Sequence, residues 1–190
     1  MMTNADALDE DLLADYARRL AALRYGTIGL VETLIVSPRM DEHVRVQTLD
    51  VLPESGPVGQ YPGKQWWQGR RVPGRQIAAV NAEVLDALGI GHEVPGDNLI
   101  ISGLDLALFA PGDALRVGDA ILIATPTPHR PCRKLAQRTS LTCRAALAAG
   151  RLRGTLFDAL RPATLAVGDA AERLLLPGAP ERLSGAVPSP

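Results

Sequence analysis

The chain has 190 residues, a length that suits one domain better than two. Hydrophobic residues make up 46% of it, which argues against wholesale disorder, and the net charge of −1 gives no overall field toward nucleic acid or a membrane. No stretch approaches the ~20 apolar residues of a membrane-spanning helix, and the acidic N-terminus is unlike a secretory signal. Because Cys132 and Cys143 are the only cysteines, no disulfide framework is expected, and we predict a reduced, cytoplasmic protein.

The first half of the chain predicts one helix followed by strands. Apolar residues at helical spacing predict an amphipathic helix over residues 6–24, which Gly26 ends. β-Branched runs predict strands over 27–36 and 44–52. Residues 53–75 form a long loop rich in Gly and Pro, which we expect to be functional if its tryptophans are buried.

The second half predicts short strands interrupted by two helices. Strands are expected over 76–80, 114–117, 119–125, 153–160 and 170–176, and helices over 82–89 and 133–149, with Asn81 as a cap for the first helix. The segments 114–120 and 164–170 echo each other, because in both a short apolar strand meets a Gly-Asp turn before a second strand. This pattern favours a closed or half-closed barrel of short strands.

Cys132 is the first candidate for chemistry. It follows Pro131 and precedes the predicted helix, and a helix N-terminus and neighbouring cations both stabilise a thiolate. His129 stands three residues before it. The alternative is that Cys132 is a small buried hydrophobic residue, as most free cysteines are, and local context does not decide between the two.

Two segments of the chain are basic and hold no carboxylate. Residues 120–157 contain seven positive charges, and residues 60–81 contain four, together with Tyr61, Trp66 and Trp67. If the segments converge, they form a pocket for phosphate or another anion, with arginine as a bidentate partner; otherwise they are solvated faces. The basic candidates are Lys64, Arg71, Arg75, Arg130 and Arg133.

A zinc site is the metal alternative at this cysteine. His129 and Cys132 form one His-x-x-Cys pair, and Cys143, His92 or His43 would have to add further ligands. Structural zinc sites usually have two such pairs, and the sequence offers one. The sequence has no phosphate loop, dinucleotide fingerprint or Gly-x-Ser-x-Gly motif.

Three segments in order resemble the MOSC domain family, named for the C-terminal domain of molybdenum cofactor sulfurase. They are Pro-Gly-Asp-Asn-Leu-Ile-Ile-Ser-Gly at 95–103, Pro-Gly-Asp-Ala-Leu-Arg-Val-Gly-Asp-Ala at 111–120, and Pro-His-Arg-Pro-Cys-Arg-Lys-Leu at 128–135. The resemblance spans roughly residues 26–176 and implies a mainly β barrel similar to that of pyruvate kinase, with a few peripheral helices. We therefore divide the chain into an N-terminal helix at 1–25, a barrel at 26–176 and a tail at 177–190.

The resemblance also implies a site. The family's functional cysteine maps to Cys132, where it would ligate molybdenum held by the pterin cofactor or carry sulfur as a persulfide. His129 would relay a proton, and the basic candidates together with Asp97 and Asn98 would bind the cofactor. The implied reaction is sulfur transfer or reduction of N-hydroxylated compounds, with a redox protein or a cysteine desulfurase as partner. The family's pyridoxal phosphate belongs to another domain and is not expected here.

Two departures from the family keep other functions open. The family's Gly-Glu-Asn-Leu is Gly-Asp-Asn-Leu at 96–99, and its upstream Gly-Asp-Arg segment has no counterpart in the loop at 53–75. One rival is a non-catalytic module that carries cofactor or sulfur. The other is a metal-free thiol enzyme that retains Cys132. The sequence predicts neither a nucleic-acid nor a membrane partner.

Overall fold

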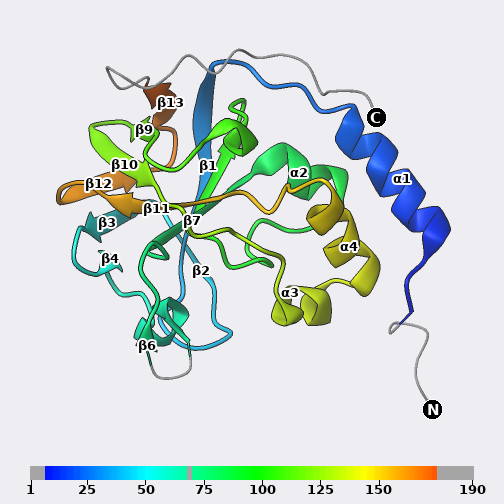
Figure 1. The fold of residues 1–190 in the computed structure, drawn as a ribbon. Helices are drawn as coiled ribbons and strands as arrows, with labels where there is room; N and C mark the ends of the chain where they lie inside the picture. The colour runs from blue at the N-terminus through cyan, green and yellow to red at the C-terminus, as the bar shows by residue number, and fades with distance from the viewer. Residues whose placement is uncertain (1–6, 68–69, 175–190) are drawn as a thin grey trace.

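Seven strands of the described chain close into a barrel (Figure 1). The computed structural model describes residues 7–67 and 70–174, and for residues 66, 67, 70 and 71 it describes the backbone only. Around the barrel the order is β1, β13, β9, β10, β11, β7, β8 and back to β1. All these neighbours are antiparallel except β7 and β8. The strands are β1 (Ile28–Val36), β7 (Ile77–Asn81), β8 (Leu99–Ser102), β9 (Ala114–Val117), β10 (Ala120–Ala124), β11 (Thr155–Ala159) and β13 (Ala170–Leu174). The predicted mainly β barrel is confirmed.

Smaller strand pairings flank the barrel. The strand predicted over 44–52 is two strands that pair with different partners, β2 (Val44–Val46) with β1 and β3 (Thr48–Leu52) with β12 (Ala163–Ala166) and β4 (Gly56–Pro57). The region 53–75 is not the structureless loop that we predicted. Besides β4 it holds a 3-10 turn, η2 (Pro62–Gln65), and a short hairpin of β5 (Trp66–Trp67) and β6 (Arg70–Arg71).

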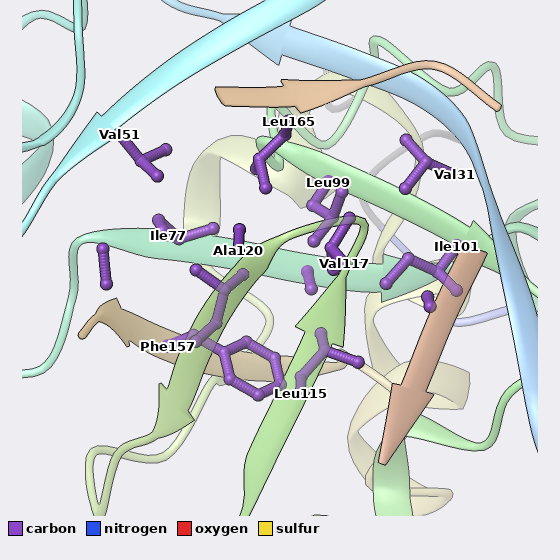
Figure 2. Packing of buried hydrophobic residues seen from close by; sticks show 14 of the residues in the cluster. Val31, Val51, Ile77, Leu99, Ile101, Leu115, Val117, Ala120, Phe157 and Leu165 are labelled. Atoms are coloured by element: carbon purple, nitrogen blue, oxygen red, sulfur yellow. The ribbon is translucent and has the colours of Figure 1, made fainter. Parts of the chain in front are cut away.

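The barrel interior is filled by side chains. Figure 2 shows residues from strands around the barrel, among them Ile101, Leu115 and Phe157, converging on one apolar centre. Phe157 has no exposed surface and meets Phe109 edge to face, with ring centroids 5.5 Å apart. A small barrel closed in this way is a packed core and not a channel, so a ligand site must lie outside it.

Helices form a second apolar layer against the outside of β7 and β8 (Figure 1). They are α1 (Glu10–Ala21), α2 (Ala82–Ala87), α3 (Arg133–Arg138) and α4 (Leu141–Ala149), with a 3-10 turn, η3 (Leu106–Leu108), between strands. Leu13, Tyr16 and Leu20 of α1 pack on this layer, and Asp9 caps the helix by accepting from the Leu12 amide at 2.9 Å. The N-terminal helix therefore shares a core with the barrel.

Two helix predictions are wrong in detail. The helix predicted over 133–149 breaks at Thr139, and Ser140 starts α4 by accepting from the Cys143 amide at 3.0 Å. Asn81 precedes α2 but does not cap it, because its side-chain oxygen accepts from the Leu106 amide at 3.3 Å while its amide group donates to the Leu104 carbonyl at 2.6 Å. A buried amide side chain that bonds a distant backbone group is not available to cap its own helix.

The echoed Gly-Asp turns also differ in what they connect. Gly118 and Asp119 join β9 to β10 as a hairpin, whereas Gly168 and Asp169 join β12 to β13, which lie in different sheets. The tail predicted at 177–190 lies outside the described residues.

Candidate functional site

Cys132 lies at the surface, where the segment after β10 enters α3. It occupies the N-cap position of this helix, as predicted, and its side chain makes no capping hydrogen bond. The residue is exposed and its thiol is free. The buried-hydrophobe alternative is therefore wrong for Cys132, whereas Cys143 is buried.

His129 points inward from the same segment. Its side chain is 10% exposed, and its Nε2 lies 3.4 Å from a carboxylate oxygen of Asp97. Burial lowers the pKa of His129 to about 3, and the charge of Arg153 outweighs the opposite effect of Asp97. The imidazole is therefore neutral near pH 7, the state in which a histidine accepts or donates a hydrogen bond without adding charge.

Asp97 and Arg153 form a buried ion pair next to His129. Their side chains are 2% and 5% exposed, and the Arg153 guanidinium donates to the Asp97 carboxylate and, at 3.4 Å, to the Pro95 carbonyl. Sequence reasoning counted Arg153 among seven cations but did not select it. The partners are 56 positions apart in the sequence, so no local spacing could have shown the pair. The one indirect signal was that the segment holding Arg153 contains no carboxylate of its own.

The two basic segments, residues 60–81 and 120–157, come together beside Asp97, where Lys64 and Arg153 both bond backbone carbonyls of residues 95–96. Lys64 donates from η2 to the Gly96 carbonyl at 2.5 Å, and its burial lowers the pKa of the ammonium to about 8. Lys64 and the half-buried Arg75 both act on His129, since their charges help to lower its pKa. His43, which sequence reasoning mentioned only as a zinc ligand, also lies here, with its Nδ1 2.5 Å from the Glu93 carbonyl.

Asn98 is fully buried and holds strands together. Its side chain donates to the Ile35 carbonyl at 3.0 Å and to the Gln60 side chain at 3.2 Å, and it accepts from the Ala78 amide at 3.3 Å. These bonds tie Asn98, which directly precedes β8, to β1, to β7 and to the segment before η2. The cofactor-binding role predicted for Asn98 stays a prediction, and in this structure its polar atoms already have protein partners.

The remaining candidates lie nearer the surface. Arg130 and Arg133 are exposed and flank Cys132 in sequence, and the side chain of Arg71 lies outside the described residues. Part of the positive charge near α3 is compensated by Asp41, which binds Lys134 at 2.9 Å and Arg138 at 2.6 Å. The site roles of Arg71, Arg75, Arg130 and Arg133 stay predictions.

For metal ligands and membrane spans, the described residues give two plain observations. They contain no group of three or more His, Cys, Asp and Glu side chains arranged to hold a metal ion. None of the helices described in residues 7–67 and 70–174 is long and apolar enough to cross a membrane.

Comparison with known proteins assigns the class. The MOSC domain model matches residues 71–172, a range that includes five of the seven barrel strands whole, most of β13 and the Cys132 segment that leads into α3. The chain belongs to the MOSC domain family.

Solved structures agree on the fold. The YUAD protein from Bacillus subtilis is 19% identical, with a TM-score of 0.63, over 77% of this chain and 95% of that one. YiiM from Geobacillus stearothermophilus is 20% identical, with a TM-score of 0.57, over 77% of this chain and 75% of that one. YiiM from Escherichia coli is 19% identical, with a TM-score of 0.56, over 77% and 70%. No curated protein matches the chain.

Proposed function

We propose that this protein binds the molybdenum cofactor, with the Cys132 sulfur as the protein ligand to the metal. The observation that carries the proposal is the exposed, unpaired thiol at the start of α3, three residues after a histidine anchored in a buried basic cluster. A thiolate ligand must be reachable from solvent and must sit on a fixed segment. The inward-pointing His129 supplies that anchor.

The residues around this thiol suit an anionic pterin. The Nδ1 atom of His129 and the Nε atom of Arg153 are buried without a hydrogen-bond partner among the described residues, which is uncommon unless a ligand or water completes the bond. Arg130 and Arg133 flank the thiol, and neither forms an ion pair with a described carboxylate. Guanidinium groups in this position would neutralise the phosphate of the cofactor.

The bound cofactor would supply a metal that exchanges two electrons. The chain itself would hold the metal through Cys132, bind phosphate through arginine, and keep a neutral His129 next to Asp97. In the reduction of an N-hydroxylated compound, the N–O bond breaks, two electrons and two protons enter, and the amine and water leave. The electrons would come from a partner redox protein, since the sequence has no flavin, haem or iron–sulfur motif.

A second candidate is a sulfur carrier, and the exposure of Cys132 favours it. The thiolate would attack the outer sulfur of a persulfide on a cysteine desulfurase, forming a new S–S bond at Cys132. The bond to the desulfurase cysteine breaks, and that cysteine leaves as a thiolate. An exposed thiol suits such transfer between two proteins, because the Cys132 sulfur must approach the outer sulfur along the axis of the S–S bond that breaks.

The test measures molybdenum per protein after expression in a host that makes the cofactor. We expect wild type to carry the metal and Cys132→Ser to lose it, while Cys143→Ala, which removes the buried thiol, retains it. Absence of molybdenum from wild type would refute the ligand role. Persulfide labelling after incubation with a cysteine desulfurase and cysteine then tests the carrier role, and a label that persists in Cys132→Ser would refute it.

A further inference from the structure

The backbone of residues 93–96, which leads directly to the buried Asp97, is held by side chains from four separate parts of the chain. Each of its four carbonyl oxygens lies within hydrogen-bond distance of a side-chain nitrogen. The pairs are His43 with Glu93 at 2.5 Å, Arg138 with Val94 at 3.2 Å, Arg153 with Pro95 at 3.4 Å and Lys64 with Gly96 at 2.5 Å. Carbonyls outside helices and sheets need such donors, so this segment is a junction between distant elements. One of the four donors belongs to α3.

The helix α3, which begins directly after Cys132, is too short to hold its own position. It has six residues, whereas isolated helices below about 12–15 residues are marginal in water. Cys132 makes no side-chain capping bond at its start. Leu135 is buried in the outer apolar layer, but apolar packing is not directional. Polar contacts must therefore set the orientation of the helix.

Arg138, in the last turn of α3, makes two such contacts with one guanidinium. Its Nη1 donates to the Val94 carbonyl at 3.2 Å, and its Nη2 donates to the Asp41 carboxylate at 2.6 Å. A guanidinium is planar, so it fixes the angle between its two partners. Arg138 thereby ties α3 both to the segment 93–96 and to the loop between β1 and β2. Among the described residues, no other side chain of α3 bonds the segment 93–96.

Lys134, one turn earlier on the same helix, shows which of the two ties is the stronger. It also binds Asp41, at 2.9 Å, but its side chain is 48% exposed and that of Asp41 is 54% exposed. Ion pairs as exposed as this one contribute little, because water and salt compete with them. The bond from Arg138 to Val94 is partly buried, so it is weakened less. The link to Val94 is therefore the main polar anchor of α3.

We propose that Arg138 is a positioning residue for Cys132. Its bonds to Val94 and Asp41 set where α3 places the thiol relative to the segment that carries Asp97. The inference rests on the function proposed above, in which the Cys132 sulfur must meet a metal at a fixed place. Arg138 itself touches no ligand in this role and acts through the helix.

The test measures amide hydrogen exchange at Ala136, whose N–H donates to the Cys132 carbonyl at 3.4 Å and so reports on the backbone of the thiol residue. We expect Arg138→Met to speed this exchange about tenfold or more, because a hydrogen bond from a charged group is lost. The Arg144 amide of α4, which donates to the Ser140 carbonyl at 3.1 Å, should exchange as in wild type. An unchanged rate at Ala136, or equal acceleration at both amides, would overturn the proposal.

Matched variants assign the effect to the bond with Val94. Lys134→Met removes the same charge from the same helix and the same partner, Asp41, so we expect exchange at Ala136 to change by less than about threefold. As large an acceleration as in Arg138→Met would overturn the role of the Val94 bond. Arg138→Lys keeps a charged donor and should recover part of the protection, and no recovery would mean that the bulk of the side chain holds α3. If Arg138→Met does not fold, Arg138→Gln replaces it with the same outcomes.

Molybdenum per protein separates this inference from the proposed ligand role. In a host that makes the cofactor, we expect Arg138→Met to carry less molybdenum than Lys134→Met. Wild-type content in Arg138→Met despite faster exchange would overturn the positioning role, because α3 would then move without consequence for the thiol. If wild type carries no molybdenum, only the ligand role of Cys132 fails, and the exchange rates still decide whether Arg138 holds α3.

Discussion

The burial of His129 predicts a specific loss of stability in acid. Its pKa is 6.5 in the unfolded chain and falls to about 3 in the fold. Below pH 6.5 the unfolded state takes up a proton that the folded state refuses, so the free energy of unfolding falls as the pH falls. Each pH unit within this window corresponds to about 1.4 kcal/mol, so His129 alone removes about 2 kcal/mol at pH 5 and approaches about 5 kcal/mol near pH 3.

Urea denaturation at pH 7, 6 and 5 measures this loss. His129→Gln lacks the titrating group, so its stability should fall less between pH 7 and 5 than that of wild type, by about 2 kcal/mol. His92→Gln is the matched control, because His92 bonds Thr33 Oγ1 outside the Asp97 cluster. The half-buried His43 is present in all three proteins, so its contribution cancels in the comparison. The same fall with pH in wild type and His129→Gln would refute the reasoning.

The parts of the fold that the sequence predicted are those with local signals. The segment 114–117 was predicted as a strand and is β9, because a short apolar run ends there at a Gly-Asp turn that reverses the chain. The order of three motif segments was enough to predict the barrel. The single strand over 44–52 failed, because β-branched composition does not reveal that Gln47 divides it between two sheets.

The helix over 133–149 failed for a related reason. Its composition is helical throughout, but Thr139 takes φ −125° and ψ −100°, and its hydroxyl donates to the Leu135 carbonyl at 2.7 Å. Ser140 then begins a new helix. A Thr-Ser pair was the only local sign, and helices tolerate such a pair unless packing turns the chain. Here Leu135 of α3 and Leu147 of α4 both pack into the outer apolar layer.

The candidate site shows where sequence reasoning stops. The neighbours of Cys132 made it a candidate, and the ordered match of three motif segments selected it; its place at the start of α3 agrees with the prediction. Arg153 and Arg144 were identified only as positive charges, because the contacts that define them join distant segments: Arg153 binds Asp97, and Arg144 donates to the Pro131 carbonyl. Long-range contacts of this kind follow from the closure of the barrel and not from spacing in the sequence.

Two further substitutions test the supports of the site. Asp97→Ala leaves the buried Arg153 charge unpaired and should cost about 3–5 kcal/mol of unfolding free energy. Asp97→Ala/Arg153→Met removes that charge as well and should recover part of the loss, as measured by urea titration of both variants. An equal or larger loss in the double variant would contradict the ion-pair argument. Gly154→Ala tests the close approach of β11 to β7, since a Cβ at Gly154 would collide with the Ala79 carbonyl. Gly112 has nearly the same φ, +90° against +91°, but has open space where its Cβ would lie. The strain of a positive φ is therefore shared and costs about 1–2 kcal/mol in each variant, and only Gly154→Ala adds a backbone collision. We expect Gly154→Ala to lose at least about 4 kcal/mol in the same assay, or to fail to fold while Gly112→Ala folds normally. Similar losses in the two variants would mean that the barrel yields at this contact, and that the position of Arg153 next to it is not fixed by the strand pairing.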